Sequence, residues 1–453
     1  MDKIKDLTQG NIPRVIGTLA APLIGASFVQ MAYSMTDMVW LGKLGSGPVA
    51  AVGAAFFFTW MGTAISYTPK IGAEISVSQS LGASNRADAL KYANNAVSLA
   101  VWIGILYGVL ILALAPALLA IFRLEPAIGD LGVQYLRWVV PGMFASTCIN
   151  TYASLYYASG NAKTPFRFIA AGLLFNIVLD PLLIFGLGPI PALGTLGAAI
   201  ATMLSQIGVL LLFATRLYSS RSPIGKLKFL SKMEKEWMRR VVQLGLPVSL
   251  QSALFSTIGM TLASFASRFG HIGVAAQSIG SQIEAISWMT ASGFSTALSA
   301  FVGQNYGAKS FARIRQAYRI TLLMAGLIGV TAGLCFICFP ELIFGVFIQE
   351  PDALREGAAY LRIMGYSQIF MVIELVTTGG FNGVGKTQIP AITGISLNLL
   401  RIPLAMLLMS SALQLSGIWW AITISSCLKG TVLAIWFYFG VLRRFPKTDQ
   451  LLS

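Results

Sequence analysis

Two acidic residues stand inside apolar stretches of the sequence. Asp37 is the only charged residue between Arg14 and Lys43. A charge at the centre of a bilayer costs at least about 2.5–3.5 kcal/mol, so an acid retained there is a functional-site hypothesis by default. Asp180 is the second acid, and Asn176 precedes it by four residues, which places both side chains on one face of a helix. Carboxyl groups in such a setting can bind protons or cations.

The composition indicates where these acids must lie. Of the 453 residues, 56% are hydrophobic and only 11% are charged, whereas soluble chains carry about 25% charged residues. Twelve apolar stretches are each long enough for the roughly 20 residues that a membrane helix needs. The sequence therefore predicts an all-α polytopic membrane protein with twelve transmembrane helices. Their expected ranges are 15–40, 48–69, 93–118, 131–158, 166–188, 193–215, 241–266, 272–299, 317–343, 357–381, 388–411 and 416–440.

The loops between these stretches alternate in charge. The formal net charge is +15, and most Lys and Arg residues lie in every second loop and at both ends of the chain. Because cytoplasmic loops carry the excess of Lys and Arg, we expect both termini to be cytoplasmic. A nucleic-acid binder would instead gather basic residues beside aromatic ones on a soluble face, so no nucleic-acid partner is expected.

The chain repeats itself with a constant offset of 225 residues, the distance from Pro22 to Pro247. The same shift takes Gln79 to Gln304. Such a repeat predicts two pseudosymmetric six-helix lobes that enter the membrane in the same direction, an arrangement typical of transporters that work by alternating access. The predicted division is 1–215 for the first lobe, 216–240 for a cytoplasmic linker and 241–453 for the second lobe.

Several motifs follow one another in order along the chain. They are Pro22 with 35–42, then 160–165, 176–181 and 194–202. Together they resemble the multidrug and toxic compound extrusion (MATE) transporters, and the likeness is greatest to the DinF-like bacterial branch. It extends over essentially the whole chain. The resemblance implies a multi-pass protein of the bacterial inner membrane that exports amphipathic and cationic compounds, driven by inward flow of H⁺ or Na⁺.

Both acids are expected in the outer half of the membrane. At 1.5 Å per residue, Asp37 lies roughly 34 Å along its helix from the cytoplasmic arginine that begins its span, and the corresponding distance for Asp180 is roughly 20 Å. We therefore expect Asp37, Asn176 and Asp180 to face one polar pocket in the first lobe. The resemblance assigns these three residues, and Thr202, to proton or cation coupling. Protonation of Asp37 would remove its attraction for a cationic substrate.

The helix face around Asp37 carries further candidates for substrate binding, namely Gln30, Tyr33, Ser34 and Met38. Aromatic faces and methionine sulfur suit amphipathic cations. Each of these residue types also serves for packing, and ligand pockets hold few convergent polar groups. The sequence alone leaves both roles open.

The second lobe has no copy of the first-lobe acids. The 225-residue shift pairs the three polar residues Asp37, Asn176 and Asp180 with Leu262, Arg401 and Ala405. A buried Arg401 needs an acidic partner, because an unpaired buried charge is strongly destabilising. Glu374 and Glu284, which lie within predicted spans, are the candidates for a structural ion pair. A second cation site is the alternative role for these two acids.

Two features bear on the coupling ion and on the class of protein. Sodium-coupled members of the resembling family are expected to use acids of the seventh and tenth helices, and the seventh span has none. Protons are therefore favoured over sodium, and no cofactor and no metal site are expected. The sequence contains no HExxH motif and no phosphate-binding loop, so an enzyme is not expected.

Together these patterns favour a secondary active multidrug exporter that exchanges protons for amphipathic or cationic compounds by alternating access. Two alternatives stay open, namely sodium-coupled drug export and a flippase for lipids or lipid-linked precursors. We expect a monomer whose partners are small molecules and the lipid bilayer.

Overall fold

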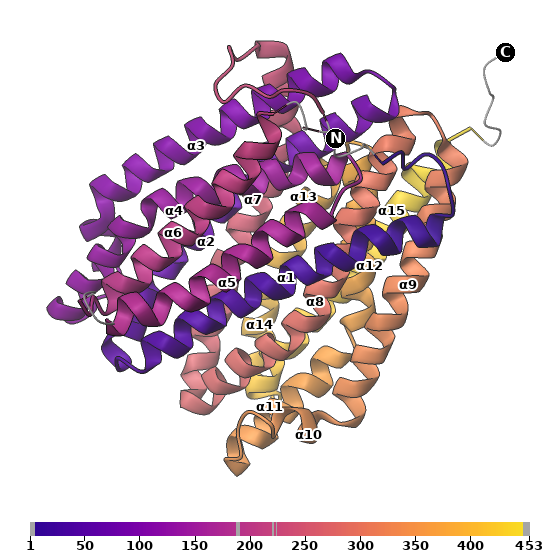
Figure 1. Cartoon of the computed structure of the whole chain (residues 1–453). Coiled ribbons are helices and arrows are strands. Elements are labelled where there is room, and N and C mark those ends of the chain that lie inside the picture. Colours follow the sequence, from indigo (N-terminus) through magenta and orange to yellow (C-terminus); the bar gives the residue numbers. More distant parts are fainter. Residues whose placement is uncertain (1–4, 187–190, 220–221, 223, 447–453) are drawn as a thin grey trace. The chain divides into compact units, whose positions relative to one another are not determined.

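The computed structural model of the chain describes residues 5–186, 191–219, 222 and 224–446. All regular elements in these residues are helices (Figure 1). In chain order they are α1 (Ile12–Gly42), α2 (Ser46–Gly82), α3 (Arg86–Ala120), α4 (Pro126–Ala158), α5 (Lys163–Phe185), α6 (Thr195–Leu217), α7 (Lys235–Ala266), η1 (Ser267–Phe269), α8 (Gly270–Gly307), α9 (Phe311–Cys338), α10 (Pro340–Phe344), α11 (Pro351–Gly365), α12 (Gln368–Gly383), α13 (Gln388–Leu399), α14 (Arg401–Met409), α15 (Gln414–Gly440) and η2 (Leu442–Arg444). Parts of the predicted lobes, linker and fifth span lie outside the described residues, namely 1–4, 187–190, 220–221, 223 and 447–453.

The predicted spans are confirmed as helices, but three of them are divided in two. The ninth span consists of α9 and α10, the tenth of α11 and α12, and the eleventh of α13 and α14. The bend between α11 and α12 is 50°. These divisions interrupt spans that the apolar pattern alone predicts as continuous.

By length and composition, nine helical segments of the described residues can cross a membrane, and ten if the bent pair α11–α12 forms one span. One of these segments, Lys235–Gly307, contains both α7 and α8. The helix α4 has 33 residues, which exceeds the roughly 20 that a span needs. Counting α7 and α8 separately and adding α4 gives the twelve predicted helices.

Large apolar side chains cover much of the surface of these helices. Leu106 on α3 is 65% exposed, Leu323 on α9 is 74% exposed and Leu407 on α14 is 67% exposed. Soluble monomers rarely expose extended apolar surface of this kind. Together with the helix lengths, this surface identifies a multi-pass membrane protein whose outer side chains face lipid.

The chain forms two compact units. Unit 1 is built mainly from Gly25–Ser249, and unit 2 from Leu7–Ile24 together with Leu250–Ser453. Both α1 and α7 are therefore divided between the units. The first half of α1 belongs to unit 2 and the first half of α7 to unit 1, whereas the predicted lobes place α1 in the first lobe and most of α7 in the second. Under the 225-residue offset Gly25 corresponds to Leu250, and the division falls at the same place in both repeats.

The first half of α7 packs on α2 within unit 1. Gly245 permits this approach, because a Cβ atom at that position would collide with the carbonyl oxygen of Thr68. Ser249 Oγ donates to the carbonyl oxygen of Ala64 at 2.7 Å. These contacts hold this half of α7 in unit 1.

The first half of α1 and the segment before it pack within unit 2. A Cβ atom at Gly293 of α8 would collide with Ile24 of α1. The backbone amide of Leu7 donates to Gln304 Oε1 at 3.0 Å, and Asn305 Nδ2 donates to the carbonyl oxygen of Leu7 at 3.1 Å. The N-terminal segment is thus fixed to the end of α8.

The described part of the predicted linker lies along the beginning of α3 in unit 1. The backbone amide of Lys228 donates to Asn94 Oδ1 at 2.9 Å, and that of Glu234 donates to Asn95 Oδ1 at 2.9 Å. Polar side chains of α3 thereby supply partners for backbone groups that form no helix.

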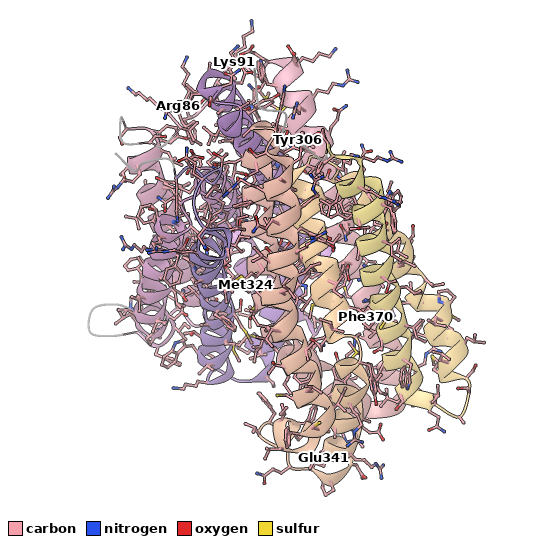
Figure 2. All side chains as sticks on the ribbon, turned by 90° about the vertical axis from the view of Figure 1, so that its right-hand side faces the viewer. Arg86, Lys91, Tyr306, Met324, Glu341 and Phe370 are labelled. Carbon is pink, nitrogen blue, oxygen red and sulfur yellow. The ribbon has the colours of Figure 1, made fainter. Side chains whose placement is uncertain are left out.

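The ends of unit 2 are far apart (Figure 2). Tyr306 at the end of α8 and Glu341 on α10 lie at opposite ends, and Met324 of α9 lies between them. The 28 residues of α9 cover about 42 Å at 1.5 Å per residue. This length is sufficient to cross the hydrocarbon core of a bilayer.

Candidate functional site

A polar cluster lies inside unit 1, where α1, α5 and α6 meet. Asn176 and Asp180 are fully buried on α5, and Asn176 Nδ2 donates to Asp180 Oδ1 at 3.1 Å, as their spacing predicts. Asp37, from the second half of α1, lies beside both side chains. On α6, Thr202 Oγ1 donates to Asp37 Oδ2 at 3.4 Å. The structure therefore brings together the four residues predicted for ion coupling.

This cluster contains more acceptor atoms than donors. Asp37 Oδ1, Asp180 Oδ2 and Asn176 Oδ1 are buried and have no hydrogen-bond partner among the described residues. A buried acceptor left without a donor costs about 1–3 kcal/mol, and more when it is charged. A proton on one carboxyl group, or a small cation held by these oxygens, would supply the missing partner.

Two further hydroxyl groups border the cluster, and the sequence did not single them out. Tyr135 on α4 is 6% exposed and lies near Thr202. Ser205 follows Thr202 by one turn of α6, is buried, and lies near the Tyr33 hydroxyl. The spacing of Ser205 from Thr202 was a usable signal, whereas only the packing of α4 against α6 brings Tyr135 to the cluster.

The four residues predicted for substrate binding have different surroundings. Tyr33 is buried, and its hydroxyl donates to the carbonyl oxygen of Thr202 at 3.5 Å. Gln30 and Tyr33 line a cavity of unit 1. Ser34 Oγ donates to the carbonyl oxygen of Gln30 in its own helix at 3.4 Å, and Met38 is 47% exposed. The structure groups Gln30 and Tyr33 and leaves Met38 on the surface of unit 1.

The cavity has a volume of about 70 Å³ and is enclosed by α1, α2, α4, α5 and α6. This is enough space for a few water molecules or one small charged group. Its polar lining is rich in amide and hydroxyl groups, and Lys70 on α2 is its one charged lining residue. Because Tyr33 and Ser205 both line the cavity and border the cluster, the two features adjoin.

Unit 2 holds a different set of buried charges. Glu374 on α12 pairs with Lys429 on α15, with Nζ and Oε1 2.9 Å apart and both side chains buried. Arg401, at the start of α14, donates from Nε to Ser425 Oγ at 3.1 Å and from Nη2 to Ser426 Oγ at 3.0 Å. The packing of α12 on α15 makes Lys429 the direct partner of Glu374.

The predicted direct pairing of Arg401 with Glu374 or Glu284 is therefore not the arrangement found. In the described residues no carboxylate oxygen lies within the 4.0 Å limit of an ion pair with Arg401, which interacts with both acids only over a longer range. Glu284 instead accepts from Tyr360 Oη at 3.2 Å and from Gln368 Nε2 at 3.3 Å. This group of side chains holds two acids and two bases, so its formal charges balance.

Known proteins share the repeat and the length of this chain. The chain matches the MatE family model over residues 22–182 and again over residues 247–407, which confirms the 225-residue repeat. The probable multidrug resistance protein NorM of Thermotoga maritima is 27% identical over 93% of this chain and 91% of that protein. The probable multidrug resistance protein YoeA of Bacillus subtilis is 25% identical over 91% of this chain and 90% of that protein.

Solved structures show the same fold. A MOP superfamily transporter from Pyrococcus furiosus superposes with a TM-score of 0.90 at 23% identity, over 98% of this chain and 100% of that chain. The doubled family match covers more than half of the chain. This chain therefore belongs to the MatE family of membrane transporters.

Proposed function

We propose that this protein is a secondary active exporter that exchanges protons for amphipathic, cationic compounds by alternating access. Membership of the MatE family supports transport. The observation that carries the proton coupling is the buried cluster of Asp37 and Asp180, whose open carboxylate oxygens require a proton or a cation. With both termini in the cytoplasm, as the loop charges indicate, this cluster lies in the outer half of the membrane.

The chemistry of the cluster links proton uptake to substrate release. When Asp37 is ionised, its negative charge attracts a cationic substrate. Protonation removes that charge and converts one acceptor oxygen into a donor. The new donor lies beside Asp180 and Asn176, where open acceptor oxygens are available. Proton binding therefore stabilises the substrate-free cluster, and proton loss prepares it for the next substrate.

The coupling ion is tested with purified protein in liposomes that contain ethidium as a cationic probe. We expect an imposed pH gradient to drive ethidium movement and a protonophore to abolish it. A sodium gradient alone should have no effect. Transport that requires Na⁺ and ignores the pH gradient would overturn the proposal and establish the sodium-coupled alternative.

The role of Asp37 is tested with Asp37→Asn, which keeps the shape of the side chain but cannot ionise. We expect pH-driven ethidium transport to fall at least about tenfold, since a loss of about 1.4 kcal/mol already produces that factor. The matched control is Asp352→Asn, because Asp352 is exposed on α11. Both variants should elute as the wild-type protein does in size-exclusion chromatography. Unchanged transport by Asp37→Asn would refute the assignment.

A further inference from the structure

An apolar groove lies in unit 2, between α8, α9 and the short helix α10. Its volume is about 490 Å³, and its walls are mainly hydrophobic side chains. Two of these, Ile286 on α8 and Leu327 on α9, are 51% and 69% exposed, so the groove opens onto the surface that faces lipid. An apolar cavity of about 150 Å³ already holds a benzene molecule. The groove therefore has room for an aromatic ring with an apolar tail.

The corresponding place in unit 1 is filled by a tyrosine ring. The 225-residue offset pairs Tyr107 with Ala332 of the groove, and Gly62 with Ser287. The Tyr107 ring lies so close to Gly62 that a Cβ atom added there would be only 2.8 Å from Cε1 of the ring. The Tyr107 hydroxyl donates to the carbonyl oxygen of Phe58 at 2.7 Å. Unit 2 thus has a methyl group where unit 1 has a phenol.

The neighbouring positions follow the same trend. The offset pairs Trp102 with Leu327, and Phe58 with Ile283, so two more rings of unit 1 have aliphatic counterparts in the groove. One ring is gained in unit 2, at Phe336. The groove is therefore space that unit 1 fills with aromatic side chains of its own and that unit 2 leaves open.

A buried hydroxyl group adds a polar requirement to the groove. Ser287 is 4% exposed, and its Oγ atom has no hydrogen-bond partner among the described residues. The hydroxyls of Thr290 and Thr331, which also line the groove, donate to carbonyl oxygens of their own helices at 2.8 Å. A buried hydroxyl without a partner is costly. An occupant that brings a hydroxyl of its own would remove this cost.

We propose that the groove is a binding site for a phenolic amphiphile that dissolves in the membrane. The ring occupies the space beside Ala332, the phenol hydroxyl forms a hydrogen bond with Ser287 Oγ, and the apolar tail extends toward the lipid. A phenol supplies both parts that the groove lacks, namely the ring that Tyr107 provides in unit 1 and a partner for the serine. A saturated acyl chain would fill the volume but leave the serine hydroxyl unpaired. This site is built from unit 2 alone and does not depend on the proposed coupling.

The site is tested by ligand binding to the full-length protein in lipid nanodiscs. The probes are 2-fluoro-4-propylphenol and its methyl ether, which keeps the ring and the tail but cannot donate a hydrogen bond. Fluorine NMR line widths, corrected with empty nanodiscs, give the affinity of each probe. We expect the wild-type protein to bind the phenol about fivefold more tightly than the ether, the factor that corresponds to one neutral hydrogen bond.

Variants of two groove residues assign this affinity to the groove. Ser287→Ala should weaken binding of the phenol about fivefold and leave binding of the ether within a factor of about two. Ala332→Tyr should weaken binding of both probes at least about tenfold, because the new ring takes the space of the probe. If this variant does not fold, the double variant Ser287→Gly with Ala332→Tyr, which reproduces the residue pair of unit 1, serves the same purpose.

The matched control is Val330→Tyr. It adds the same side chain to α9 at a position that is 44% exposed and does not line the groove, so this variant should bind both probes as the wild-type protein does. Two results would overturn the proposal. Equal affinities for phenol and ether that Ser287→Ala leaves unchanged would show a groove for any apolar chain, including a lipid acyl chain. Binding that is absent from the wild-type protein, or that persists when position 332 carries tyrosine, would show that the groove is not the site.

Discussion

The ion pair between Glu374 and Lys429 provides a quantitative test of how unit 2 is stabilised. Its atoms are 2.9 Å apart, and Glu374 is 9% exposed and Lys429 4% exposed. With an effective dielectric constant of about 20, the attraction at this distance is about 6 kcal/mol, much of it offset by the desolvation of both groups. Replacing one partner strands the other charge. We therefore expect Glu374→Met and Lys429→Met each to lower the free energy of unfolding by about 3–5 kcal/mol.

The double variant is expected to lose less stability than either single variant, because it leaves no stranded charge and replaces the pair with apolar side chains. A matched control exists in the same unit. Arg362 and Glu341 pair at 2.8 Å, but their side chains are 49% and 57% exposed. Since exposed pairs contribute about 0–1 kcal/mol, the corresponding methionine variants of this pair should change stability by no more than that.

Both cycles are measured by unfolding the purified protein in mixed micelles of increasing SDS fraction, with helix content followed by circular dichroism. The reasoning predicts strong coupling in the buried cycle and weak coupling in the exposed one. Additive losses at Glu374 and Lys429, or equal losses in the two cycles, would refute it.

Two further predictions concern unit 1 and α7. Gly245→Ala should lower the free energy of unfolding by about 1–3 kcal/mol, because the new methyl group collides with the backbone of Thr68. Gly259→Ala on the same helix meets nothing within 4 Å and should raise the free energy of unfolding by roughly 0.5–1 kcal/mol. If Gly245→Ala were the more stable of the two variants in SDS unfolding, the packing of α7 on α2 would be contradicted. Thr202→Val removes a long hydrogen bond to Asp37, so pH-driven ethidium transport should fall by less than about tenfold. A loss as complete as that of Asp37→Asn would show that the hydroxyl is indispensable.

The membrane spans and the repeat were predictable because lipid imposes long apolar helices and because the 225-residue offset is visible in the residues themselves. The divided spans carried only a partial signal. Pro340 begins α10, and Pro403 lacks the amide that would donate to the carbonyl oxygen of Leu399, next to the break at Leu400. No proline marks the bend at 366–367 between α11 and α12. After the break at Leu400, Ser425 and Ser426 of α15 bind the guanidinium of Arg401. A partner supplied by another helix leaves no local signal.

The exchange of the first halves of α1 and α7 between the two units could not be predicted from the sequence. A prediction from the sequence keeps each continuous helix in one lobe, whereas side-chain packing determines to which compact unit each half of a helix belongs. The contacts of Gly245 with Thr68 and of Gly293 with Ile24 join positions far apart in the sequence. Such contacts depend on shapes that a single sequence does not reveal.

The candidate site was predictable in part. The spacing of Asn176 and Asp180 predicted that they share a helix face, and the resemblance to MATE transporters identified Thr202. Lys429 was missed although its signal was present, because it is the one charged residue in the 27 residues of α15. The argument that singled out Asp37 applies equally to this lysine. Its pairing with Glu374 still required the packing of α12 against α15.

The balanced charges of unit 2 have an electrical consequence. A membrane potential acts on net charge that moves through it, at about 2.3 kcal/mol per elementary charge for each 100 mV. Glu284, Glu374, Arg401 and Lys429 sum to zero formal charge, so displacement of this group carries no current. In the described part of unit 1, Asp37 and Asp180 accept hydrogen bonds from the neutral side chains of Thr202 and Asn176, and under the proposed coupling their charge changes with each bound proton. If the proposed coupling holds, the voltage dependence of the transport current reports the proton occupancy of Asp37 and Asp180.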